Sequence, residues 1–512
     1  MFQIQIKLPP EGGSLSGAAA AALHTSPTNI QAVKVLKRSI DARHTPQWIY
    51  TLAVSVKEKS GITAKSYTPP VPFHIPKVHS RVRPVVVGFG PAGLFGALVL
   101  ARAGLRPIVL ERGKDVETRK KDLQRFFSTG NLSPASNVQF GEGGAGAFSD
   151  GKIGTGIKSP LLHFITDTLL LHGAPAEIAY EAHPHIGSDR LPQVVKSIRE
   201  EIIRQGGEVH FDTQLTDLHC KGNAICAAVT SHAVYPTSAI LLAIGHSARD
   251  TFAVLRQKNV TLLAKPFSVG ARIEHPRSVI DHALYGSAAA HLPAAEYRLV
   301  AHLPSGRSLY SFCMCPGGYV IPAASEIGGV VTNGYSLHAR DGENSNCALL
   351  VGITPDDFGH DPFDGVQLQR QIEEAAFRIA GNYLAPCQRV EDFLQNRPSS
   401  AFGSVHPTYA RGVVPGNIAD CLPDFVADTM RQGLPLFAKK IKPFAMPDAL
   451  LTAPETRSSS PLRICRNAQY ESNLAGLFPA GEGSGYAGGI MSAAADGMMA
   501  ALSIIDRISA SV

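Results

Sequence analysis

Short apolar runs separated by glycines dominate the pattern between residues 85 and 113. Val85–Val87 is an apolar run that ends in a glycine-rich turn, and a helix-like apolar pattern follows directly. A second apolar run then ends at Glu111. Short apolar runs bounded by glycine are typical of buried strands, whereas a longer periodic segment is typical of a helix. The pattern therefore predicts a strand, a helix and a second strand, the repeating unit of a parallel α/β sheet.

The turn in this unit has the glycine spacing of a dinucleotide-binding fingerprint. Gly88 permits the tight turn, Gly90 lets the backbone approach a pyrophosphate, and Gly93 lets the helix pack closely on the sheet. Glu111 follows 18 residues after Gly93, where a carboxylate can accept both ribose hydroxyls. A glycine-rich turn without a ligand is the alternative, but it does not require strand, helix and acid in register. The residues expected to bind an adenine dinucleotide here are Gly88, Gly90, Pro91, Ala92, Gly93, Glu111 and Arg112.

The C-terminal segment favours FAD over a simple nicotinamide cofactor. Residues 474–506 read as a strand, a glycine loop and a long helix, and the start of that helix could face the N1/O2 edge of a flavin. An ordinary connection between strand and helix is the alternative. Only the GxGxxG at Gly88–Gly93 is followed by a helix and a second strand ending in an acid, which disfavours the disulfide reductases that bind both FAD and NAD(P), so NAD(P)H is expected only as a transient donor. The cofactor-binding residues expected on this side are Gly481, Glu482, Gly488, Gly489 and Ile490, together with Gly245 at the end of an apolar strand in residues 238–250.

The remaining patterns divide the chain into four parts. FQIQIKLP alternates like a strand, and an Ala-rich helix at about Leu15–His24 and two further alternating segments follow it. After residue 263 the hydrophobic pattern changes to many short strand-like runs, with one clear helix near Gln367–Leu384. We expect a small basic α/β domain with a Pro-rich linker (1–80), the first part of an FAD-binding domain (81–263), a mixed α+β substrate domain (264–440) and the closing part of the FAD-binding domain (441–512).

Six strings carry a resemblance to a known family. They are VVVGFGPAGLFGALVLARAG, NVQFGEGGAGAFSDGKI, IGHSARDTF, SFCMCPGGYV, ETRSSSPLRI and PAGEGSGYAGGIMSAAADG, spread from about residue 30 to the C-terminus. The chain resembles the uncharacterised family of FAD-dependent, NAD(FAD)-utilising dehydrogenases. That resemblance implies a Rossmann-like FAD domain of the glutathione-reductase type, interrupted by a second domain and preceded by a small one. Glu482 stands where broader flavoprotein families often have Asp, and the family has no agreed substrate.

A second glycine-rich segment is a candidate lining for the isoalloxazine ring. Gly141 and Gly144 stand among further glycines and precede Lys152, which could stabilise a reduced flavin anion. Backbone N–H groups of such small residues could reach flavin O4 and N5. A mobile surface loop is the alternative.

Three residues are candidates for the substrate side. Cys313 and Cys315 are separated by one residue, which is too few for Cys-x-x-Cys, and strand alternation would point both thiols the same way. Packing or close approach to the flavin is the favoured interpretation, with a redox role as the alternative. Arg457 could orient an anionic group, and a salt-bridged turn is an equal alternative. No catalytic residue is assigned.

Composition limits the remaining possibilities. Residues 1–84 hold 11 Lys/Arg against 3 Asp/Glu, whereas the rest holds 37 against 39. These basic N-terminal residues could bind nucleic acid, but no recognition motif with interleaved aromatic residues accompanies them, so a solvated surface is favoured. Eight scattered cysteines suggest a reducing, cytoplasmic location, and no apolar run is long enough to span a membrane. His183 and His185 favour a structural turn over a metal site, and no metal is expected.

The sequence therefore predicts an FAD-dependent oxidoreductase that transfers hydride through flavin N5. Its partner would be a small-molecule substrate or a redox partner, whose identity is open, as is the oligomeric state. An FAD-dependent nucleic-acid-modifying protein and a non-enzymatic FAD-binding docking module are the alternatives.

Overall fold

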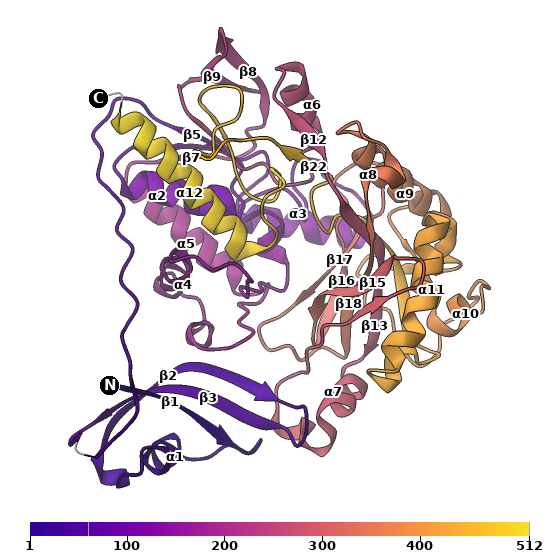
Figure 1. The fold of residues 1–512 in the computed structure, drawn as a ribbon. Coiled ribbons are helices and arrows are strands. Elements are labelled where there is room, and N and C mark those ends of the chain that lie inside the picture. The colour runs from indigo at the N-terminus through magenta and orange to yellow at the C-terminus, as the bar shows by residue number, and fades with distance from the viewer. Residues whose placement is uncertain (60, 511–512) are drawn as a thin grey trace.

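The computed structural model describes residues 1–59 and 61–510. Figure 1 shows a small N-terminal domain joined by a long extended segment to a larger body. The larger body contains a parallel sheet with its helices and a second, mostly antiparallel sheet. The chain is therefore a mixed α/β protein.

The N-terminal domain is a four-stranded sheet with one helix. The alternating apolar residues of its strands face α1, where Ile6, Leu52 and Val54 pack with Ala19 and Leu23. Ser14 caps the start of the helix by accepting a hydrogen bond from the Gly17 N–H group. The strand order is β2-β3-β1-β4, with β1 (Phe2–Leu8), β2 (Ile30–Asp41), β3 (Gln47–Val56), β4 (Lys65–Ser66) and α1 (Leu15–Ala22).

A five-stranded parallel sheet forms the centre of the unit that follows the N-terminal domain, called here the parallel-sheet unit. Alternate residues of its short strands pack on opposite faces: Val86 joins the cluster under the helices, whereas Val85 and Val87 join the cluster on the other face. The order is β23-β11-β5-β6-β7, with β5 (Val85–Val87), β6 (Ile108–Leu110), β7 (Glu208–His210), β11 (Ile240–Leu242) and β23 (Leu477–Pro479).

Helices cover one face of this sheet, and a β-meander with one helix covers the other. The first set is α2 (Pro91–Arg102), α4 (Leu161–Leu171), α5 (Leu191–Arg204) and α12 (Ile490–Ser509). The second set is β8 (Leu215–Lys221), β9 (Ala224–Thr230), β10 (Val234–Pro236) and α6 (Arg249–Gln257), while α3 (Val116–Thr129) follows β6. The return of residues 474–506 to this sheet, as β23 and α12, agrees with the pattern in the sequence.

The rest of the larger body, called here the second domain, is built on a seven-stranded sheet in the order β14-β15-β18-β13-β21-β19-β20. Its strands are β13 (Phe267–Pro276), β14 (Val300–His302), β15 (Ser308–Cys315), β18 (Asn344–Ile353), β19 (Ala385–Arg389), β20 (Val413–Pro415) and β21 (Leu450–Glu455). Two pairs accompany it, β16 (Gly318–Pro322) with β17 (Thr332–Ser336), and β12 (Leu262–Ala264) with β22 (Leu462–Ile464). Its helices are α7 (Arg277–Tyr285), α8 (Pro355–Phe358), α9 (Asp364–Ala380), α10 (Val390–Leu394) and α11 (Asp424–Ala438).

Two boundaries differ from those expected from the sequence. β21 lies beyond residue 440 but pairs with β13 and β19, so the chain leaves the second domain after Glu455. A strand that completes a sheet across so many intervening residues leaves no local signal of where it belongs. The helix expected near Gln367–Leu384 begins at Asp364 and ends at Ala380, because Gly381 follows with a φ of +67°.

Among the described residues, no helix combines the length and the apolar character that crossing a membrane requires.

Candidate functional site

A large cavity opens at the carboxyl ends of β5, β6 and β11, where ligands bind in open α/β sheets. It encloses about 1470 Å³ of atom-free space, part of it open to solvent. One side is formed by the parallel-sheet unit and the opposite wall by the second domain. Of the residues expected from the sequence, the cavity is lined by Gly88, Gly90, Pro91, Ala92, Glu111, Arg112, Gly144, Lys152, Gly245, Cys313, Arg457, Gly481, Glu482, Gly489 and Ile490. Gly93, Gly141, Gly488 and Cys315 are not among its lining residues.

The glycine turn between β5 and α2 is sterically required. Gly88 has a φ of +92°, and a Cβ there would clash with the carbonyl oxygen of Ala243. A Cβ at Gly93 would lie 2.9 Å from the Gly88 carbonyl carbon, because the helix starts directly against the strand. The first N–H groups of α2 have no acceptor within the helix and are available to an anionic group at this edge.

Glu111 is held by the backbone of three segments. Its Oε2 accepts a hydrogen bond from the Phe89 N–H at 2.8 Å, and its Oε1 accepts from Gly113 at 2.8 Å and Gly141 at 3.0 Å. The residue is 4% exposed but lines the cavity. A carboxylate offers about four acceptor positions, so one remains for a ligand. Glu111 therefore organises the glycine turn as well as facing the expected ribose position.

The glycine-rich segment expected beside the flavin is anchored in the protein interior. Residues 136–143 are buried, and the fully buried guanidinium of Arg119 donates to the carbonyl oxygens of Asn137, Val138 and Glu142 at 2.7–2.9 Å. Gly144 lies against the dinucleotide turn, since a Cβ on it would be 2.9 Å from the Gly90 Cα. This geometry does not fit a mobile surface loop.

The C-terminal loop places an unusual carboxyl group in the cavity wall. Burial raises the pKa of Glu482 to about 7, although the Lys265 ammonium group partly offsets that shift. Gly489 caps α12 with a φ of +87°, and a Cβ on it would meet no atom within 4 Å. The start of α12 is thus open to the cavity, and a flat ring could approach its N–H groups.

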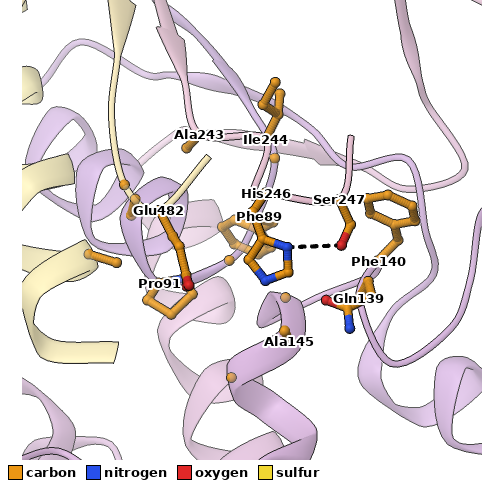
Figure 2. Close-up of a pocket in the computed structure, with 18 of the residues that line it drawn as sticks. Phe89, Pro91, Gln139, Phe140, Ala145, Ala243, Ile244, His246, Ser247 and Glu482 are labelled. Atoms are coloured by element: carbon orange, nitrogen blue, oxygen red, sulfur yellow. Dashed lines mark hydrogen bonds between the residues drawn. The ribbon is translucent and has the colours of Figure 1, made fainter. Parts of the chain in front are cut away.

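His246 and Ser247 belong to the site but were not predicted from the sequence. Figure 2 shows the His246 ring projecting into the cavity near Glu482, and its Nδ1 is 3.0 Å from the Ser247 hydroxyl oxygen. Burial, together with the charges of Arg457 and Arg249, lowers the pKa of His246 to about 3, so the imidazole is neutral at pH 7. Its position directly after Gly245, at the carboxyl end of β11, was the available signal.

Arg457 lines the cavity with its charge paired inside the protein. The guanidinium binds Glu373 on α9 through Nε at 3.0 Å and Nη2 at 2.9 Å. Its Nη1 donates to the hydroxyls of Ser247 and Ser325. Glu373 also binds Arg249 on α6. This network joins the two domains, which corresponds to the salt-bridged alternative considered for Arg457.

The second domain supplies a wall that contains a thiol and several charges. Cys313 and Phe312 from β15, Asn333 from β17 and Glu455 from β21 line it, next to Lys152. Lys152 pairs with Asp150, which also binds Arg340 at 2.9 Å. Further lining residues that the sequence did not single out are Val87, Phe89, Leu110, Gln139, Phe140, Ala145, Thr213, Leu215, Ala243, Ile244, Thr251, Ser458, Ala480 and Ala493.

His183 and His185 both have partners within the protein. His185 stacks on His338 with ring centroids 5.4 Å apart, and its Nε2 lies 3.0 Å from the His338 carbonyl oxygen. Within residues 1–59 and 61–510, no group of three or more His, Cys, Asp or Glu side chains is arranged to hold a metal ion.

The fold and cavity define an α/β protein in which a parallel-sheet unit with the glycine turn of dinucleotide-binding proteins faces a second domain across the cavity. The chain is 46% identical over 502 residues to an uncharacterised protein of Clostridium beijerinckii (strain ATCC 51743 / NCIMB 8052), covering 95% of this chain and 94% of the relative. The chain belongs to the same family as that protein. Residues 266–458 match the family model described as FAD-dependent protein, C-terminal domain-like, and residues 1–57 match a domain of unknown function (DUF8436).

Solved structures give more distant similarities. Glycine oxidase from Bacillus cereus ATCC 14579 matches with 9% identity and a TM-score of 0.35, over 84% of this chain and 96% of that one. L-proline dehydrogenase from P. horikoshii matches with 12% identity and a TM-score of 0.36, over 84% and 94%. A mutant of the E. coli quinol fumarate reductase FrdA matches with 11% identity and a TM-score of 0.38, over 84% and 71%. Similarities this distant do not indicate an activity for this chain.

Proposed function

We propose that the protein is an FAD-dependent oxidoreductase that moves a hydride through flavin N5. The main support is that one continuous cavity runs from the glycine turn between β5 and α2 to the wall formed by the second domain. The match of that second domain to the FAD-dependent family model supports it.

The hydrogen-bonding groups that line the cavity fit FAD in an extended conformation. The adenosine end would lie at the glycine turn, where Glu111 has an acceptor position left and Arg112 is fixed over the Phe140 ring at 4.3 Å. Open space where Cβ atoms would stand at Gly245 and Gly489 gives room for a ligand along the rest of the path. The ring would lie between the Gly144 segment and the start of α12. Bound there, FAD would supply two-electron transfer chemistry.

The side chains around the expected ring position can handle charge and protons. Glu482 has a pKa near 7, so it can hold or release a proton at neutral pH. His246 is neutral and can donate or accept a hydrogen bond without adding charge. Burial opposes the charge of Lys152, but the Cys313–Cys315 pair and the Asp150 carboxylate outweigh it and raise the pKa of Lys152 above its usual range, so the amine keeps its proton. A fixed ammonium group at this wall would stabilise negative charge that develops on reduction.

We infer a glutathione-reductase-type FAD unit, a small-molecule substrate bound against the second domain, and a cytoplasmic location consistent with eight free thiols. The single strand–helix–strand unit with a glycine fingerprint leaves NADH or NADPH as a transient donor at the open face of the cavity.

Anaerobic visible spectra of the FAD-loaded protein, before and after NADH or NADPH, test the donor. Bleaching of the flavin bands by one nucleotide would establish a pyridine-nucleotide-linked flavoenzyme. Bands that persist with both nucleotides, and bleach with dithionite, would contradict the nicotinamide half-reaction while leaving FAD in place.

A further inference from the structure

The strand that carries the two cavity-side cysteines is bulged where they stand. In the pairing of β15 with β18, Phe312 lies opposite Ala348 and Cys315 lies opposite Asn346, so two residues face one. Cys313 has a φ of +43°, the left-handed region that residues other than glycine rarely occupy. Bulges and such backbone conformations concentrate at functional sites, where they redirect a side chain. Here the result is a thiol in the cavity wall.

The two thiols differ in access, and the thiol of Cys315 bonds to the backbone of Cys313. Cys313 is partly exposed and lines the cavity, whereas Cys315 is completely buried behind it. The Cys315 Sγ donates to the Cys313 carbonyl oxygen at 3.3 Å. A hydrogen bond between the two thiols lowers the pKa of Cys313 well below the usual range and raises that of Cys315. The pair therefore resembles a nucleophilic thiolate with a protonated partner.

Two cations fix the backbone around the pair. The Lys152 ammonium group donates to the carbonyl oxygen of Met314, the residue between the cysteines. Arg272 is fully buried; its Nη1 donates to the Cys313 carbonyl oxygen at 3.0 Å and lies 3.9 Å from the Cys315 Sγ. Arg272 is also paired with Glu455 and Lys152 with Asp150, but both cations still add positive potential beside the cysteines and help to lower the pKa of Cys313.

We propose that Cys313 and Cys315 are a second two-electron redox centre, a dithiol and disulfide couple that exchanges electrons with the flavin of the same cavity. In the oxidising direction the Cys315 S–H bond breaks and a Cys313–Cys315 S–S bond forms. The two electrons released from the sulfurs would be accepted by the FAD proposed for this cavity, and the Cys315 proton would leave with them to the reduced cofactor. This inference rests on the proposed function, because the flavin is the electron acceptor.

The first test follows the sulfurs directly and does not depend on FAD. Trypsin releases residues 308–340 as one peptide that holds Cys313 and Cys315 and no other cysteine. After oxidation of the full-length protein with diamide and alkylation in denaturant, we expect this peptide unalkylated and lighter by two hydrogens than its dithiol form. A peptide alkylated at both cysteines after diamide would overturn the proposal.

The second test counts electrons in the FAD-loaded protein. Anaerobic dithionite titration should take up four electrons per FAD in the oxidised wild type, and two in Cys313→Ser and Cys315→Ser. Cys347→Ser is the matched control, because Cys347 is buried on the adjacent strand, bonds to Tyr297 and does not line the cavity, so it should keep four. The same uptake in the wild type and both serine variants would overturn the proposal. A protein that binds no FAD would refute the proposed function, while the peptide mass would still decide whether the cysteines form a redox pair.

Discussion

At the scale of single residues, Glu111 has two roles that an alanine substitution separates. Glu111→Ala removes the acceptor of three buried N–H groups, each costing about 1–3 kcal/mol when unpaired. We therefore expect the FAD-free protein to lose at least about 3 kcal/mol in unfolding free energy. FAD retention should also weaken. Urea unfolding and FAD retention under competition measure the two effects, with the exposed Glu117→Ala as the control. Full FAD occupancy in Glu111→Ala would contradict the placement of the ribose.

The carboxyl group of Glu482 should make stability depend on pH. Burial raises its folded pKa to about 7, above the unfolded value, so the folded state binds the extra proton and this contribution is lost as pH rises from about 4.5 to 7. Replacing it by Gln removes the dependence. The stability of Glu482→Gln relative to wild type should therefore increase by on the order of 2 kcal/mol between pH 5 and pH 8. A difference that stays constant in urea unfolding across this range would show that Glu482 titrates normally.

At the scale of elements, the crossing of α2 and α12 sets the position of both helix starts at the cavity. A Cβ at Gly497 of α12 would lie 2.6 Å from the Ala92 carbonyl carbon of α2. We expect Gly497→Ala to push the helices apart and to destabilise the protein by about 1–3 kcal/mol in thermal or urea unfolding. Gly352→Ala is the control, since a Cβ there meets no atom within 4 Å. Equal stability of the two variants would mean that the helices do not need this close approach.

At the scale of the whole molecule, the N-terminal domain has its own core and a limited contact with the body. Arg38 links the N-terminal domain to the body. Its side chain pairs with Glu181, and its backbone N–H donates to the Tyr180 carbonyl oxygen at 2.7 Å. Deletion of residues 1–66, which keeps the linker residues that pack on the body, should therefore leave FAD binding unchanged, measured as the ratio of flavin to protein absorbance. Loss of flavin on deletion would show that the domain supports the site. Salt-sensitive RNA retention that vanishes with the deletion would instead favour the nucleic-acid alternative.

The sequence predicts those cavity-lining residues whose positions follow from spacing within one strand–turn–helix unit. The glycine turn, Glu111 and the start of α12 obey spacing rules that hold within one strand–turn–helix unit, so their positions could be read from the pattern. The membership of β21 in the second sheet could not, because its partner β13 is far away in the chain. The paired state of Arg457 depends on Glu373 from another element for the same reason. The bulge that redirects Cys313 breaks strand alternation and has no signal in the letters SFCMC.

We propose that this cavity binds both the adenosine half and the flavin half of FAD. Titration of the flavin-free protein with FAD, and separately with FMN, measures this by flavin fluorescence and absorbance. We expect one FAD per chain and much weaker binding of FMN, because FMN lacks the adenosine half that the Gly88–Gly93 turn and Glu111 would bind. Absence of FAD binding, or equal affinity for FMN, would show that the cavity does not bind the dinucleotide in this way.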